Sequence, residues 1–209
     1  MITSLALALA QDDAHKPYVA PASEDGRLAI ERMKAPDGFK IELWAAEPHL
    51  ANPVAMCMDA KGDCYVAEDF RIKAGVDDIR DHMDWLDDDV ACRTVEDRVA
   101  YLRKRLGDKF ADYSKDSERV RWVGDTNGDG VADSDSVFAA GFNDPAAGVG
   151  AGLLAWKDRV FYTCIPTLWS LRDSNGDHVA DEKTALSSGY GIRFALMGHD
   201  LHGLAIGPD

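Results

Sequence analysis

The stretch DTNGDGVAD at residues 125–133 recurs as DSNGDHVAD at residues 173–181, an offset of 48 residues (173 minus 125). A glycine–aromatic pair follows each copy at the same distance, as Gly141-Phe142 and Gly189-Tyr190. A repeat of 40–50 residues with short strands between the copies is typical of β-propeller blades. The sequence therefore predicts an all-β fold, a partial β-propeller.

Strand patterns surround the two copies. Short apolar or alternating runs, bounded by turn residues, predict strands. They cover residues 39–44, 54–58, 64–67, 153–156, 160–163 and 168–171. The second and third of these runs predict a hairpin about Lys61-Gly62.

A helical insertion is expected near residues 76–113. Thr94 is a candidate N-cap, with Asp97 as the acidic residue three positions later. Apolar residues then recur at helical spacing up to Leu106, and Gly107 ends the pattern. Most charges of this insertion are interpreted as a solvated face.

The N-terminus carries a candidate targeting signal. Residues 5–10 are apolar, and Ala8-Leu9-Ala10 resembles a cleavage site. We therefore expect residues 1–10 to be a truncated signal peptide, residues 11–36 a linker or arm, and residues 37–209 the N-terminal part of a propeller domain truncated at its C-terminus. The expected location is secreted or periplasmic. The sequence contains no run of about 18 apolar residues, so we do not expect membrane insertion.

Composition restricts the partners. The 209-residue chain has 37 acidic and 23 basic residues and a net charge of -14. Of the acidic residues 29 are Asp, which favours turns and oxygen ligands for cations. Nucleic acid and anionic lipid need a basic surface, so neither is an expected partner.

The four cysteines are Cys57, Cys64, Cys92 and Cys164, and they form no C-x-x-C or C-x-x-C-H motif. Zinc-ribbon, thioredoxin and c-type haem sites are therefore not predicted within this chain. The predicted hairpin brings Cys57 near Cys64, which leaves a disulfide or two free thiols as alternatives.

Both repeat loops present side-chain oxygens in the pattern D-x-N-x-D-x-x-x-D. Hard cations such as calcium take six to eight oxygens, so calcium is the candidate metal. Position 12 holds no Glu, and no helices are predicted on either side, which argues against an EF-hand. The alternative is a tight turn in which Asp and Asn bond to their own backbone. The candidate metal ligands are Asp125, Asn127, Asp129 and Asp133 in the first loop and Asp173, Asn175, Asp177 and Asp181 in the second.

The segment GHDLHGL at residues 198–204 is the other candidate site. A histidine there has the basicity of a general base near neutral pH. In an extended strand the side chains of His199 and His202 would point to opposite faces, which argues against a metal site shared by the two.

Residues 199–209 resemble the H-x-x-G-x-L-x-x-G-P-D segment of the soluble quinoprotein glucose and sorbosone dehydrogenases. Further segments carry a second resemblance: residues 38–43 with Glu47-Pro48, residues 82–89, residues 93–97, the two Asp loops, Ile165-Pro166 and residues 198–209. With these segments, residues 38–209 are more similar to one branch, the secreted planctomycete-type "membrane-bound dehydrogenase" or haem-binding C-x-x-C-H proteins. The resemblance implies a six-bladed propeller, of which this chain would form about half. It also implies pyrroloquinoline quinone as the cofactor, with His199 as the catalytic base. Arg193 and His202 are the candidate cofactor-binding residues beside it.

The implied function is quinone-dependent oxidation of a sugar or polyol, with a c-type cytochrome domain as a redox partner. The haem motif of many relatives is absent, and most cofactor residues would come from later blades. The alternative is a non-enzymatic, calcium-stapled propeller that binds a glycan or a protein, because fold does not determine function.

Overall fold

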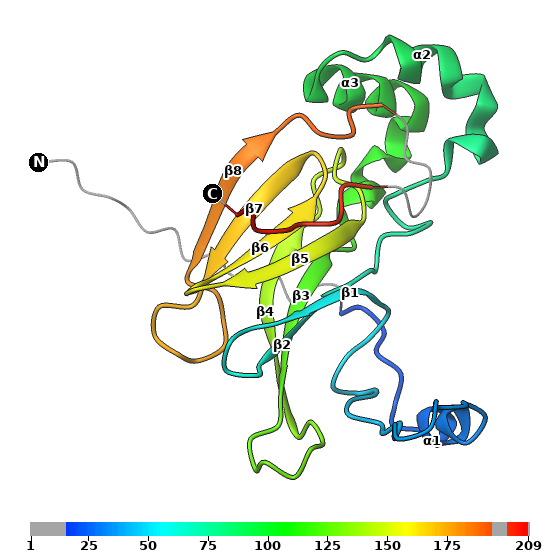
Figure 1. The fold of residues 1–209 in the computed structure, drawn as a ribbon. Helices are drawn as coiled ribbons and strands as arrows, with labels where there is room; N and C mark the ends of the chain where they lie inside the picture. Colours follow the sequence, from blue (N-terminus) through cyan, green and yellow to red (C-terminus); the bar gives the residue numbers. More distant parts are fainter. Residues whose placement is uncertain (1–15, 194–199, 209) are drawn as a thin grey trace, which may run out of the picture.

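The computed structural model describes residues 16–193 and 200–208 and consists mainly of two four-stranded antiparallel sheets (Figure 1). Sheet 1 has the order β1-β2-β3-β4, with β1 at Pro53–Met58, β2 at Cys64–Glu68, β3 at Glu118–Gly124 and β4 at Ser134–Phe142. Sheet 2 has the order β5-β6-β7-β8, with β5 at Gly150–Trp156, β6 at Arg159–Cys164, β7 at Thr167–Arg172 and β8 at Glu182–Ser188.

The two sheets repeat one plan. In each sheet the four strands follow one another as neighbours, and an Asp loop joins the third strand to the fourth. The predicted hairpin about Lys61-Gly62 is confirmed as β1 and β2, and the three strands predicted between the loops are confirmed as β5, β6 and β7. The prediction of a mainly β fold is therefore confirmed, although the described residues do not by themselves form a closed ring.

The core lies between the sheets. Its buried members include Tyr65, Trp122 and Phe138 from sheet 1 and Tyr162 and Leu171 from sheet 2. Burial of each large apolar side chain contributes roughly 1.5–3 kcal/mol to the free energy of unfolding. These residues therefore dominate the attachment of one sheet to the other.

The loop at residues 173–181 extends back onto sheet 1. The backbone N–H of Ala180 donates to the carbonyl of Phe138 on β4 at 2.8 Å. The His178 ring stacks on Trp122 of β3, with ring centroids 3.6 Å apart. His178 has a φ of 62°, a region that glycine prefers, and the stacking contact compensates for this conformation.

The first Asp loop makes the corresponding backbone bond to the segment before sheet 1. The N–H of Ala132, which is the counterpart of Ala180, donates to the carbonyl of Trp44 at 2.8 Å. Each Asp loop is thus fixed to the chain segment that precedes its own sheet.

Lys183 also joins the sheets. Its Nζ donates to the carbonyls of Ala140 and Gly141 at 3.1 and 2.9 Å and lies 3.6 Å from the centre of the Phe142 ring. Burial lowers the pKa of this amine to about 8.

The prediction of a strand at residues 39–44 is wrong. The segment has no strand assignment, and the Phe39 side chain is 74% exposed. Alternation makes a strand only where a neighbouring strand pairs with it, and Phe39 donates its N–H instead to Pro36 within a local turn. Trp44 packs against the buried cluster of Cys64, Val66, Val123 and Ala132. Helix α1, Asp25–Ile30, lies within the segment predicted as a linker or arm.

The predicted helical insertion is confirmed between β2 and β3. It comprises the 3-10 helices η1, Ile79–Trp85, and η2, Gly107–Ser114, with α2, Leu86–Ala91, and α3, Val95–Leu106, between them. The Thr94 hydroxyl accepts the N–H of Asp97, whose carboxylate accepts the N–H of Thr94, each at 3.1 Å. This capping box matches the prediction.

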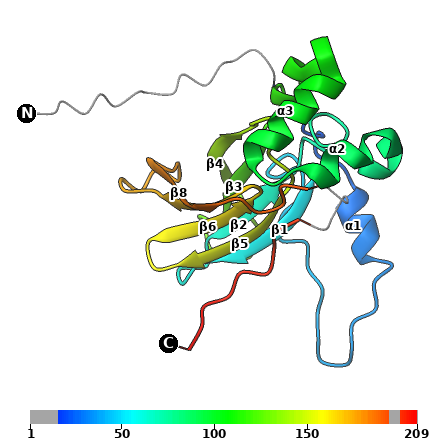
Figure 2. The ribbon, with the colours of Figure 1, turned by 90° about the horizontal axis from the view of Figure 1, so that it is seen from above.

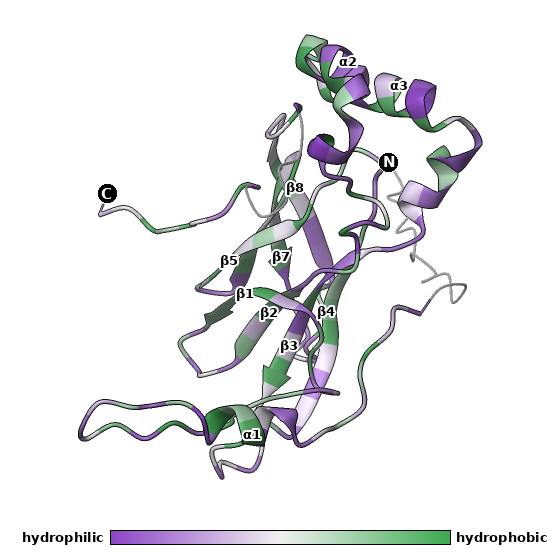
Figure 3. Ribbon diagram, turned by 90° about the vertical axis from the view of Figure 1, so that its right-hand side faces the viewer, coloured by the Kyte–Doolittle hydropathy of each residue, from purple (hydrophilic) through white to green (hydrophobic). Residues whose placement is uncertain are grey.

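The helical insertion lies at one end of the sheets, and the two Asp loops lie at the other end (Figure 1). Figure 2 looks down on the molecule from the end that carries the insertion. Polar and apolar residues alternate over α2 and α3 (Figure 3), as expected for helices with one covered side. No helix in residues 16–193 or 200–208 is both long and apolar enough to span a membrane.

The four cysteines are free. Cys57 packs into the core between the sheets, whereas Cys64 belongs to the cluster around Val66 on the opposite face of sheet 1. The two thiols therefore face away from each other, which excludes the disulfide alternative. Burial raises the pKa of Cys57 to about 11, so this thiol stays protonated near neutral pH.

Candidate functional site

The end of the sheets that carries the helical insertion contains a buried polar cluster. Arg71 is fully buried directly after β2. Its Nη2 donates to the carbonyls of Gly75 and Tyr113 at 3.0 Å each, and its Nη1 to the carbonyl of Phe142 at 3.4 Å. One guanidinium thus joins the loop after β2, the helical insertion and the end of β4.

Glu118, at the start of β3, is the acidic member of this cluster and is also fully buried. Its Oε1 accepts the N–H groups of Phe70 and Arg71, and its Oε2 accepts that of Gly150, each at 3.1 Å. Burial, followed by the neighbouring Asp69 carboxylate, raises the pKa of Glu118 to about 9. Glu118 therefore holds a proton at neutral pH and fixes both sheets through their backbones.

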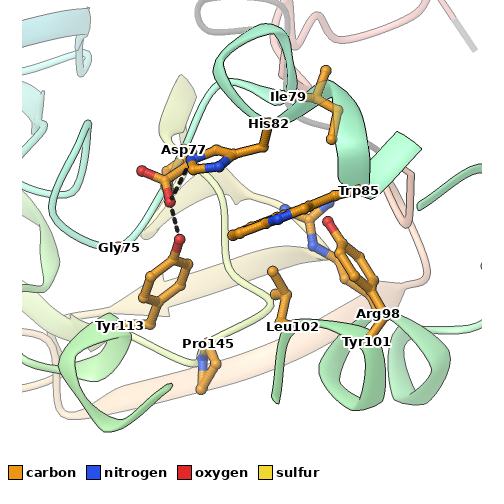
Figure 4. A pocket seen from close by; sticks show the side chains of 11 residues that line it. Gly75, Asp77, Ile79, His82, Trp85, Arg98, Tyr101, Leu102, Tyr113 and Pro145 are labelled. Atoms are coloured by element: carbon orange, nitrogen blue, oxygen red, sulfur yellow. Dashed lines mark hydrogen bonds and ion pairs between the residues drawn. The ribbon is translucent and has the colours of Figure 1, made fainter. Parts of the chain in front are cut away.

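A second group of side chains lies where the helical insertion meets the loop after β2 (Figure 4). The Tyr113 hydroxyl donates to Asp77 Oδ2, and His82 Nε2 lies 3.5 Å from the same oxygen. The His82 ring stacks on Trp85 with centroids 4.0 Å apart. The cavity among these residues measures about 20 Å³, which is enough for about one water molecule and too small for a substrate.

Arg98 of α3 binds the segment at residues 191–193 through the backbone. Its Nη1 donates to the carbonyls of Gly191 and Arg193 at 3.1 and 3.3 Å. Arg193 in turn donates from Nε to the carbonyl of Cys92 at 3.1 Å. The Arg193 guanidinium therefore docks this segment on the helical insertion.

The larger cavity, of about 500 Å³, lies beside β1 and β5. We call it the β1–β5 cavity. Most of its lining residues are apolar, among them Val54, Met56, Ile72, Val149, Leu153 and Leu204. Asp200 and His202 bring polar groups to its lining.

Residues 200–204 are attached to sheet 2 by two hydrogen bonds. Asp200 Oδ2 accepts the N–H of Val149 at 2.8 Å, and the carbonyl of Leu201 accepts the Thr163 hydroxyl. The Cα of His202 passes so close to Gly152 that a Cβ there would lie 3.2 Å from it. This attachment brings His202 and Asp200 to the same cavity.

The predicted site residues are only partly brought together. His202 lines the β1–β5 cavity, but Arg193 is not among the residues that line it. His199, the candidate base, lies outside the described residues, as does the candidate signal peptide at residues 1–10. The Asp200 carboxylate reaches the cavity, although the sequence assigned it no role.

The lining does not suit the implied quinone. Pyrroloquinoline quinone carries several carboxylates, which require cationic partners. Among the described residues that line the β1–β5 cavity there is no Lys or Arg. We therefore derive no chemical step through the quinone.

The Asp loops use their candidate ligands to hold their own backbone. In the first loop Asp125 Oδ1 and Oδ2 accept the N–H groups of Gly128 and Gly130 at 2.7 and 2.8 Å. Asp173 makes the corresponding bonds to Gly176 and His178 at 2.7 and 2.9 Å. In the part of the chain that the structure describes, no group of three or more His, Cys, Asp or Glu side chains is arranged to hold a metal ion.

Calcium binding at these loops stays a prediction. A bound cation would draw the Asp129 and Asp177 carboxylates to a common centre, and alanine at either position would remove a ligand. The expected result is a calorimetric calcium titration whose heat decreases in Asp129→Ala and in Asp177→Ala. The same heat in the unmodified protein and in both variants would exclude calcium from the loops.

Comparison with known proteins identifies the family of this chain. A family model described as "Domain of unknown function (DUF7133)" matches residues 26–209. No curated protein and no solved structure matches the chain. Because the match includes both sheets, the helical insertion and the β1–β5 cavity, the chain belongs to the DUF7133 family of domains of unknown function.

Proposed function

We propose that this chain contributes consecutive blades to a β-propeller of the sorbosone-dehydrogenase-like kind, and that its β1–β5 cavity binds a hydroxyl compound. The observation that carries the proposal is a cavity of about 500 Å³ whose polar groups, Asp200 and His202, lie together on one short segment. Sites for small ligands have this combination of a mainly apolar wall and few polar groups.

The blade arrangement is supported by the repeated plan of the two sheets. Their first strands, β1 and β5, pack side by side, as the inner strands of neighbouring blades do. The equivalent bonds from Ala132 to Trp44 and from Ala180 to Phe138 support a common relation between each unit and the one before it.

Asp200 and His202 are the residues that would recognise hydroxyl groups. A carboxylate accepts a hydroxyl hydrogen bond, and a neutral imidazole both donates and accepts. The Val149 N–H orients the Asp200 carboxylate beside the cavity.

The lining supports the binding step alone. Oxidation of the bound alcohol with His199 as base, the quinone, export and a cytochrome partner remain predictions from the sequence. The alternative of a binding module without redox chemistry is favoured by the absence of Lys and Arg from the described lining residues.

The test is ligand binding by calorimetry and ligand-observed NMR, with sorbitol, glucose and trans-cyclohexane-1,2-diol as probes. We expect His202→Ala to weaken binding of the bound probe by about tenfold, which is the loss of one hydrogen bond of about 1.4 kcal/mol. The matched control is His49→Ala, because His49 pairs with Asp135 away from the cavity. If none of the three probes binds, or if both variants bind like the unmodified protein, the proposal is wrong.

A further inference from the structure

We infer that the ligand of the β1–β5 cavity is an uncharged alcohol with an apolar body and its hydroxyl groups on one side, and not an open-chain polyol. This inference rests on the proposed function and names the ligand class of the same site.

The first observation is the apolar wall. Val54 and Met56 project from β1 with 44% and 61% of their surface exposed, and both line the cavity. Leu153 of β5 and Val149 continue the wall. A hydroxyl group placed against such a wall loses its water without gaining a hydrogen bond, which is unfavourable. A polyol with hydroxyls on every carbon cannot avoid this loss, whereas a hydrocarbon ring face gains from the contact.

The second observation is that the ionisable lining groups come from one segment. Asp200 and His202 are two residues apart, and the neighbouring chain is fixed by the Thr163 hydroxyl on the Leu201 carbonyl. Hydrogen bonds from this segment reach one side of a ligand. A compound with two neighbouring hydroxyls on one edge matches this arrangement.

The third observation is charge. None of the described lining residues is Lys or Arg, so an anion would lose its water there without gaining a cationic partner. Sugar phosphates, uronic acids and other carboxylates are therefore disfavoured. The volume of about 500 Å³ accommodates a ring compound of moderate size.

The experiment compares three probes by calorimetry and ligand-observed NMR: trans-cyclohexane-1,2-diol, sorbitol and cyclohexanecarboxylate. We expect the diol to bind at least about tenfold more tightly than sorbitol or the carboxylate. Met56→Gln keeps the side-chain length and adds polarity. We expect it to lower the affinity for the diol by about three- to tenfold.

Met58→Gln is the matched control. Met58 lies on the same face of β1 and is 54% exposed, but it is not among the residues that line the cavity. Both positions are exposed, so both variants should fold. The inference is overturned if sorbitol binds as tightly as the diol, or if the two Gln variants bind the diol equally. Tight sorbitol binding that His202→Ala weakens would leave the proposed function standing and remove only this inference. If no probe binds, both are wrong.

Discussion

Replacing Arg71 with methionine is expected to lower the free energy of unfolding by about 3–5 kcal/mol. Methionine retains most of the aliphatic volume but donates no hydrogen bonds. The carbonyls of Gly75, Tyr113 and Phe142 would lose their shared donor in a fully buried place. Each buried acceptor left without a partner costs about 1–3 kcal/mol, so the effects accumulate.

The measurement is urea unfolding, followed by circular dichroism and tryptophan fluorescence. Arg27→Met is the control, because Arg27 is 59% exposed and pairs with Glu24 and Glu31 on the surface of α1. Surface pairs contribute at most about 1 kcal/mol. A loss below about 1 kcal/mol in Arg71→Met would show that Arg71 does not join the insertion to the sheets.

The second large effect is a dependence of stability on pH that originates at Glu118. Its pKa in the folded protein is raised to about 9 from an ordinary value of 4.5. Between these two values the folded state holds a proton that the unfolded state has released. Stability from this group is therefore complete below about pH 4.5 and decreases as the pH rises towards 9. The slope approaches about 1.4 kcal/mol per pH unit within this window.

Glu118→Gln isolates this contribution. The amide cannot ionise, so the slope due to position 118 disappears, and subtracting the two stability curves cancels the other titrating groups. The amide nitrogen would also face the N–H of Gly150, which now donates to Oε2, so Glu118→Gln should be less stable by about 1–2 kcal/mol at pH 5. We expect the difference to shrink or reverse by pH 8. A difference that is constant from pH 5 to pH 8 would mean that Glu118 is ionised in the folded protein.

Local patterns predicted the hairpin of β1 and β2, the strands β5 to β7 and helix α3. The repeated Asp loop identified two equivalent sheets, and Thr94 with Asp97 identified the start of α3. The segment at residues 39–44 misled the analysis because alternation specifies which side chains share a face but does not supply a neighbouring strand. That information lies in the tertiary structure.

The residues of the candidate site were harder to predict from the sequence than the strands and helices. His202 was singled out because two histidines three residues apart, beside an aspartate and bounded by glycines, form an uncommon pattern. Val54 and Met56 looked like ordinary strand residues. Glu118 left a signal that went unused: it alternates with Val120 and Trp122, so it shares the face of β3 that packs into the core between the sheets. A charged residue in phase with buried neighbours indicates a buried carboxyl group. Arg71 follows a strand end with no periodicity, so its burial could not be inferred from spacing.

The backward attachment of each Asp loop gives the molecule a direction. Sheet 2 needs Phe138 and Trp122 of sheet 1 to seat its loop, whereas sheet 1 seats its own loop on Trp44. The repeating unit is therefore a four-stranded sheet together with an Asp loop that is bonded to the preceding part of the chain. In such an array stability passes from neighbour to neighbour, as in a stacked repeat protein. A substitution that loosens sheet 1 should therefore also loosen the loop of sheet 2, which is seated on Phe138 and Trp122.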